Sequence, residues 1–130
     1  MIIGYTSGVF DILHIGHRNF LQACKRQCDI LYVGVDSDTR VKQLKGIFRP
    51  VQPEIERVKN VSKYCDYAFI KFNPSQTYFE SIHPNVIFES SEKCNSKTIQ
   101  GFQGKYIKIQ YTKDISTTKL ITLAPCNIVA

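Results

Sequence analysis

Short apolar runs recur along the chain, separated by longer and more polar segments. Runs of this length and composition are typical of buried β-strands. They predict five strands, at Ile2–Thr6, Ile30–Val35, Tyr67–Phe72, Asn85–Glu89 and Tyr106–Tyr111.

Helical spacing of apolar residues appears between several of these runs. Phe20, Leu21 and Cys24 share one face of a helix that begins near Gly16. Further helices are expected after Pro53, over Thr77–Ile82, and over Ser116–Leu123, where hydroxyl residues can cap the first turn. The segment Thr39–Val51 is too polar and basic for core and is interpreted as a loop. The polar segment Ser90–Gly104 is interpreted as a loop with some helical turns.

The predicted strands and helices alternate along the chain, and this alternation indicates the fold class. We expect a three-layer α/β/α, Rossmann-like domain with a five-stranded parallel sheet, formed as a single domain by residues 1–130. Ligands of such folds bind at the carboxyl ends of the strands. Three polar segments should meet there: Gly8–His17, the basic loop Thr39–Val51, and the helix start at Ser116.

The net charge and the cysteine content of the chain limit the classes of function that we expect. Lysine and arginine exceed aspartate and glutamate by 17 to 11, giving a net charge of +6, so we expect an anionic partner. Nucleic acid is disfavoured because the basic residues lack a stacking array or a known reader motif. The five cysteines show no paired spacing and indicate reduced thiols. Without a signal peptide or a membrane-length apolar run, a soluble cytoplasmic protein is expected.

The stretch Gly8–His17 carries the strongest chemical signal. Two imidazoles, His14 and His17, lie three positions apart around Gly16. Glycine lets the backbone approach an anion, and a helix start presents N–H groups and the positive end of the dipole. The stretch therefore predicts a phosphate-binding loop at the end of the first strand.

These residues resemble a known family. Gly8-Val-Phe-Asp-Ile-Leu-His-Ile-Gly-His17 is similar to the G-x-F-D-x-x-H-x-G-H signature of the cytidylyltransferase-like nucleotidyltransferases, and Ile115-Ser-Thr-Thr-Lys119 resembles their second signature. The small bacterial members of this family that are closest to this chain in size resemble glycerol-3-phosphate cytidylyltransferase. The middle segment, Val41–Gly46 and Arg49–Arg57, looks more like the adenylyltransferases that activate heptose phosphate.

The resemblance implies a reaction and a set of residue roles. An acceptor phosphate would attack the α-phosphorus of a nucleoside triphosphate, accompanied by Mg²⁺, and release pyrophosphate. His14, His17 and Lys45 would be catalytic. Asp11 would orient the acceptor or the Mg²⁺, with no metal held directly by protein ligands predicted. The residues that would bind the nucleotide and its phosphates are Gly8, Val9, Phe10, Gly16, Lys42, Arg57, Ser116, Thr117 and Thr118.

Some positions depart from the family pattern. Tyr111 and Asp114 replace an arginine and a glycine of the second signature, and Glu89–Glu92 replaces a glycine-aspartate segment. These positions concern the substrate walls, so two alternatives stay open. CTP and a small phosphorylated alcohol, polyol or sugar are the first expectation; ATP with a sugar phosphate, or an inactive nucleotide-binding module, is the alternative. The resemblance also implies a homodimer.

Overall fold

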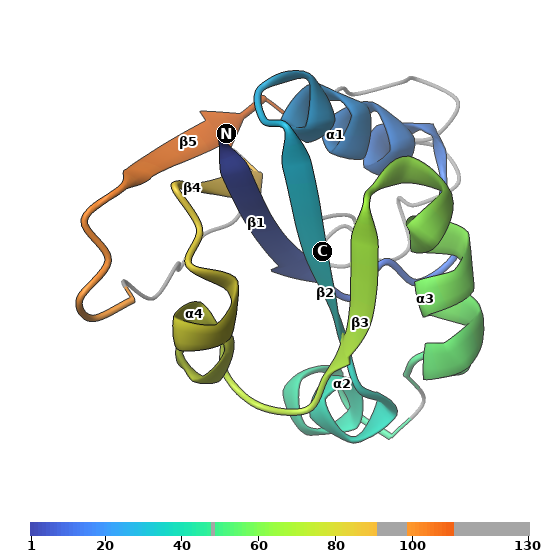
Figure 1. Ribbon diagram of the computed structural model, residues 1–130. Coiled ribbons are helices and arrows are strands. Elements are labelled where there is room, and N and C mark those ends of the chain that lie inside the picture. Colours follow the sequence, from blue (N-terminus) through green and yellow to red (C-terminus); the bar gives the residue numbers. More distant parts are fainter. Residues whose placement is uncertain (48, 91–98, 111–130) are drawn as a thin grey trace.

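The computed structural model describes residues 1–47, 49–90 and 99–110. Strands and helices alternate along the chain, as Figure 1 shows. The strands are β1 (Ile3–Gly8), β2 (Ile30–Asp36), β3 (Tyr67–Lys71), β4 (Val86–Ser90) and β5 (Lys105–Ile109). The helices are α1 (Ile15–Arg26), α2 (Asp38–Lys45), α3 (Glu54–Val61), the short 3₁₀ turn η1 (Ser62–Tyr64) and α4 (Gln76–Ile82).

All five strands form one parallel sheet in the order β3-β2-β1-β4-β5. The chain runs outward from β1 to β3 and then returns to place β4 on the other side of β1. This reversal creates a switch point between β1 and β4, where loops diverge from the carboxyl ends of the strands. The predicted Rossmann-like fold with a five-stranded parallel sheet is confirmed.

Apolar side chains on both faces of the sheet hold the layers together. On one face, Leu31 and Val33 of β2 are fully buried against Leu21 of α1 and Val61 of α3. On the other face, Tyr5 of β1 packs in a second cluster that includes side chains of α4. Helices therefore cover both faces, which explains why the strand sequences are apolar without strict alternation.

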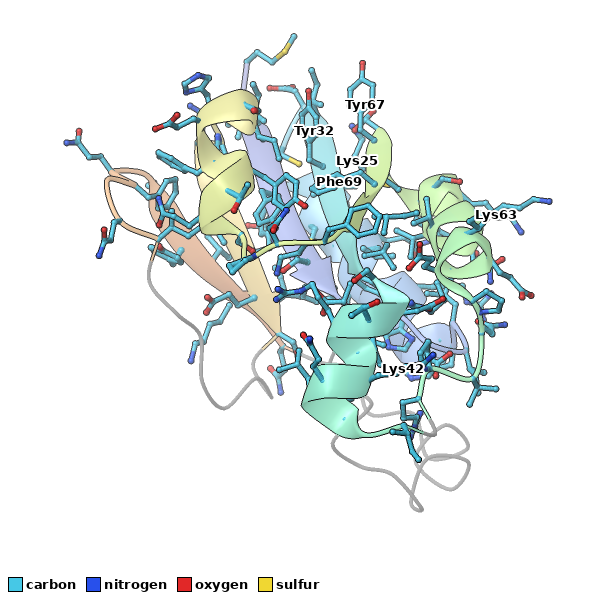
Figure 2. The ribbon with its side chains drawn as sticks, turned by 90° about the horizontal axis from the view of Figure 1, so that it is seen from below. Lys25, Tyr32, Lys42, Lys63, Tyr67 and Phe69 are labelled. Carbon is cyan, nitrogen blue, oxygen red and sulfur yellow. The ribbon has the colours of Figure 1, made fainter. Side chains whose placement is uncertain are left out.

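The outer half of the α4 face carries aromatic side chains. The rings of Tyr32 and Tyr67 stack at 4.9 Å between centroids, and Figure 2 shows Phe69 beside them. Tyr67 remains 56% exposed. These rings extend the second layer of the core across β2 and β3.

The interpretation of Thr39–Val51 as a loop is wrong for its first half, which forms all of α2 except the first residue, Asp38. The Ser37 side chain caps this helix by accepting a hydrogen bond from the Arg40 N–H at 3.2 Å, and lysines in its last turn suit the negative end of the helix dipole. Val41 is the one buried residue of α2, so the sequence shows no apolar periodicity there.

No helix among the described residues is both long and apolar enough to cross a membrane.

Three cysteines in the described part of the chain are free thiols. Cys24 is buried on the inner face of α1, while Cys28 and Cys65 are half-buried. Burial raises the pKa of Cys65 to about 12 and also raises the pKa of Cys24. Thiols with raised pKa values are poor nucleophiles at neutral pH, so these two serve packing rather than chemistry.

Candidate active site

The loop after β1 leads directly into α1 and has an unusual backbone. Phe10 and Ile12 adopt φ angles of 53° and 54°, in the left-handed region that favours glycine. The Phe10 side chain is fully buried, and its ring meets the His17 ring at 5.6 Å in an edge-on contact. Such conformations persist only where surrounding contacts fix them.

His14 and His17 form a capping box at the start of α1. The His14 Nδ1 accepts a hydrogen bond from the Gly16 N–H at 3.1 Å, and the His17 Nδ1 accepts from the His14 N–H at 3.4 Å. A neutral imidazole that accepts at Nδ1 carries its proton at Nε2. Both rings are therefore Nε2–H donors, and they stack at 3.9 Å between centroids.

The protonation state of His14 follows from its surroundings. Burial lowers the pKa of His14 below its ordinary value, and the nearby positive charge of Arg18 lowers it further. The ring is therefore neutral at pH 7. Its Nδ1 can therefore cap the helix, and the ring carries its proton at Nε2.

The structure places Asp11 against a neighbouring segment of the chain. Its carboxylate accepts hydrogen bonds from the backbone N–H groups of Val51 at 2.8 Å and Gln52 at 2.9 Å, and lies 3.4 Å from the Arg49 guanidinium. The carboxylate is nearly inaccessible, with a side-chain exposure of 2%. These contacts fix the segment before α3 against the loop after β1, which favours a structural role for Asp11.

Arg57 lies behind the same loop, fully buried. Its guanidinium donates to the carbonyl oxygens of Val9 and Asp36, both at 2.8 Å, and to that of Gln52 at 3.0 Å. It also pairs with the Asp38 carboxylate at 2.7 Å. Since these donors face protein oxygens on three segments, the arrangement favours a positioning role over direct contact with phosphate.

Lys42 and Lys45 belong to α2, which begins just beyond the carboxyl end of β2. Figure 2 views the molecule from below, with α2 in front and Lys42 on it. Lys42 is exposed and Lys45 is half-buried. The structure thus brings both lysines and the loop after β1 to one edge of the sheet.

Six residues singled out in the sequence lie outside the described residues. They are Ser116, Thr117 and Thr118 of the predicted phosphate site, and the divergent Tyr111, Asp114 and Glu92.

Three polar side chains at this edge were missed as site residues by the sequence interpretation. Lys71 ends β3, Asp36 ends β2, and Ser7 is the penultimate residue of β1. The Lys71 Nζ lies 3.5 Å from the Ser7 Oγ and 3.7 Å from the Asp36 carboxylate. The position of these residues at the ends of strands could have identified them. In the sequence, however, Lys71 lies inside the predicted apolar strand.

A parallel sheet of this order, with a histidine-capped helix after its first strand, defines a Rossmann-like nucleotide-binding domain. The chain belongs to the cytidylyltransferase-like family, whose sequence pattern matches residues 5–123. It is thereby a nucleotidyltransferase, and the predicted family and enzyme class are confirmed.

The chain is also similar to individual proteins of known sequence or structure. The "Bifunctional protein HldE" of Bradyrhizobium sp. (strain ORS 278) is 33% identical over 94% of this chain, which spans only 26% of that protein. The crystal structure of the lipopolysaccharide core biosynthesis protein from Thermoplasma volcanium GSS1 matches 87% of this chain and 99% of its own, with a TM-score of 0.78 and 26% identity. Pantoate-beta-alanine ligase from Francisella tularensis covers 88% of this chain and 61% of its own, with a TM-score of 0.56 and 13% identity, and shares the fold alone.

The Arg57→Met variant should be less stable than the natural protein by about 3 kcal/mol. The change leaves the buried carbonyl oxygens of Val9 and Asp36, the half-buried one of Gln52 and the Asp38 carboxylate without their donor. Urea unfolding followed by circular dichroism measures this loss. Lys59→Met, an exposed change on the same helix, is the matched control and should stay within about 0.5 kcal/mol. Equal stability of the two variants would contradict the positioning role.

The Arg18→Gln variant should raise the pKa of His14, while burial still holds it below the ordinary value of 6.5. Between the lowered pKa and 6.5, the unfolded chain binds more protons at this site than the folded protein does. This site therefore makes stability rise with pH through that interval. NMR titration of the imidazole resonances measures the pKa, and Arg26→Gln in the last turn of α1 serves as control. An unchanged His14 pKa in Arg18→Gln would refute the electrostatic assignment.

Proposed function

We propose that this protein transfers an adenylyl group from ATP to a phosphorylated sugar and releases pyrophosphate. The observation that carries the proposal is the stacked pair His14 and His17, which supplies two Nε2–H donors at a helix start on the carboxyl edge of a nucleotidyltransferase sheet. The similarity to HldE proteins, together with the middle segment Val41–Arg57, supports ATP over the CTP expected first from chain size.

The proposed reaction is a single in-line displacement. A phosphate oxygen of the acceptor bonds to the α-phosphorus of ATP, the bond from that phosphorus to the bridging oxygen breaks, and pyrophosphate leaves with the electron pair. Catalysis then consists of holding the two substrates in line and stabilising charge on the leaving group. His14 and His17 would donate hydrogen bonds to it, and Lys42 and Lys45 would neutralise its charge.

Mg²⁺ fits this proposal as a companion of the triphosphate, whose charge it would neutralise. Both carboxylate oxygens of Asp11 already accept backbone hydrogen bonds. Among the described residues, no group of three or more histidine, cysteine, aspartate or glutamate side chains is placed to hold a metal ion. In the proposed reaction the ion would enter the site together with the triphosphate. A homodimer, which the family resemblance implies, stays a prediction that light scattering can measure.

The test of the proposed function is pyrophosphate release from each nucleoside triphosphate with Mg²⁺ and a panel of acceptors. The panel contains six- and seven-carbon aldose 1-phosphates and glycerol 3-phosphate. We expect the highest kcat/KM with ATP and an aldose phosphate. His14→Ala should lower kcat by about a hundredfold, the usual cost of one lost transition-state donor. His83→Asn, an exposed histidine whose left-handed backbone asparagine tolerates, is the matched control.

Each other outcome of this assay has a distinct meaning. A higher kcat/KM with CTP would overturn the choice of nucleotide. Full activity in His14→Ala would remove the role of the imidazole pair. Thermal stabilisation of folded protein by ATP, without pyrophosphate from any combination, would identify a nucleotide-binding module that lacks catalysis.

A further inference from the structure

Ile12 has an unusual backbone conformation for its residue type. Its φ angle of 54° lies in the left-handed region, where a β-branched residue is an outlier. Phe10, with a similar φ angle, is fully buried, whereas Ile12 is 52% exposed. Burial of the Ile12 side chain therefore cannot repay the cost of this conformation. Strained residues of this kind persist only where other contacts hold them, and they cluster at functional sites.

A hydrogen bond from another segment holds the Ile12 backbone. The Ile12 N–H donates to the side chain of Gln52 at 3.0 Å. Because the donor is an N–H group, the Gln52 atom that accepts is the amide oxygen Oε1. The two residues are 40 positions apart in the sequence. The contact therefore ties the loop after β1 to the segment before α3 at the strained residue itself.

Gln52 is held by two further hydrogen bonds. Its backbone N–H donates to the Asp11 carboxylate at 2.9 Å, and its backbone carbonyl accepts from the Arg57 Nε at 3.0 Å. Both partners are buried side chains. Pro53 follows Gln52 and restricts its backbone to extended conformations. Gln52 thus offers the Ile12 N–H an acceptor whose backbone is fixed by contacts independent of Ile12.

The direction of the chain at Ile12 matters for the histidine pair. His14 lies two residues further on, and its Nδ1 caps α1 by accepting from the Gly16 N–H. Without the Gln52 acceptor, water could bond to the exposed Ile12 backbone, but water would not fix the direction of its N–H group. Ile12 would then relax towards negative φ, and His14 would move away from the position that the cap requires.

We infer that Gln52 is a positioning residue for nucleotidyl transfer, which holds Ile12 in the left-handed conformation through Oε1 and thereby sets His14. The inference rests on the proposed function, because it takes His14 to act on the reacting phosphates. It also explains why an unfavourable conformation is kept at an exposed position. The strained residue fixes the direction in which the chain enters α1, where the phosphates would bind.

The test compares Gln52→Met, Ile12→Asn and the two changes combined, with the best acceptor of the panel. Gln52→Met removes the acceptor atom and keeps the length of the side chain, so kcat/KM for ATP should fall about fivefold, the cost of one lost neutral hydrogen bond. Asparagine adopts the left-handed conformation readily, so in the Ile12→Asn background the same change should lower kcat/KM less than about twofold. Gln27→Met, which alters an exposed glutamine at the end of α1, is the matched control.

A second measurement follows the position of His14 without catalysis. The NMR amide resonance of Gly16, whose N–H donates to His14 Nδ1, should shift in Gln52→Met, and in the double variant it should match that of Ile12→Asn alone. Urea midpoints show which variants are folded. If Gln52→Met is not, Gln52→Asn, whose side chain is one carbon shorter, takes its place.

Two results would overturn the positioning role. One is an equal loss of kcat/KM in both backgrounds, which would mean that Gln52 acts independently of the Ile12 conformation. The other is an unmoved Gly16 resonance in Gln52→Met. Absence of turnover in the natural protein would instead refute the proposed function, and the Gly16 resonance would still decide whether Gln52 positions His14.

Discussion

The arrangement of the candidate active site depends on the hydrogen bonds that the buried Arg57 guanidinium donates. One side chain from α3 holds the loop after β1 through Val9, the end of β2 through Asp36, and the segment before α3 through Gln52. A buried cation is costly unless its donors are satisfied, and here each nitrogen of the fork meets an oxygen. The guanidinium therefore fixes three segments that are distant in the sequence but adjacent at the carboxyl edge.

The same contact explains how an unfavourable backbone is maintained. Phe10 follows the carbonyl that Arg57 holds and adopts a left-handed conformation that costs a non-glycine residue on the order of 1 kcal/mol. Burial of its ring in the core repays that cost, and Asp11 secures the next turn through Val51 and Gln52. These contacts hold the loop where it enters α1, and they thereby position the histidine pair at the start of that helix.

Sequence patterns were sufficient for the strands and for the histidine motif, because both depend on local composition and spacing. They failed for α2, where a serine cap and a single buried residue, Val41, replace an apolar stripe. They also could not tell whether the charged groups of Asp11 and Arg57 face a ligand or the protein. That distinction depends on burial and on partners 19 to 48 residues away, as for the Arg57 bonds to Asp38 and Val9. Lys71 was missed for the same reason, since its neighbours at the edge come from other strands.

The neutral state of His14 has a further consequence for how the site handles charge. Protonation would place a hydrogen on Nδ1, which would then face the Gly16 N–H as donor against donor and remove the cap of α1. A lost cap costs about 1 kcal/mol, and that cost opposes proton uptake when a triphosphate approaches. In the proposed reaction the imidazoles would act as neutral hydrogen-bond donors, while Lys42 and Lys45 on α2 would supply the full positive charges. This division would keep the His14 cap of α1 intact while negative charge builds on the leaving group, because His14 would not have to change its protonation state.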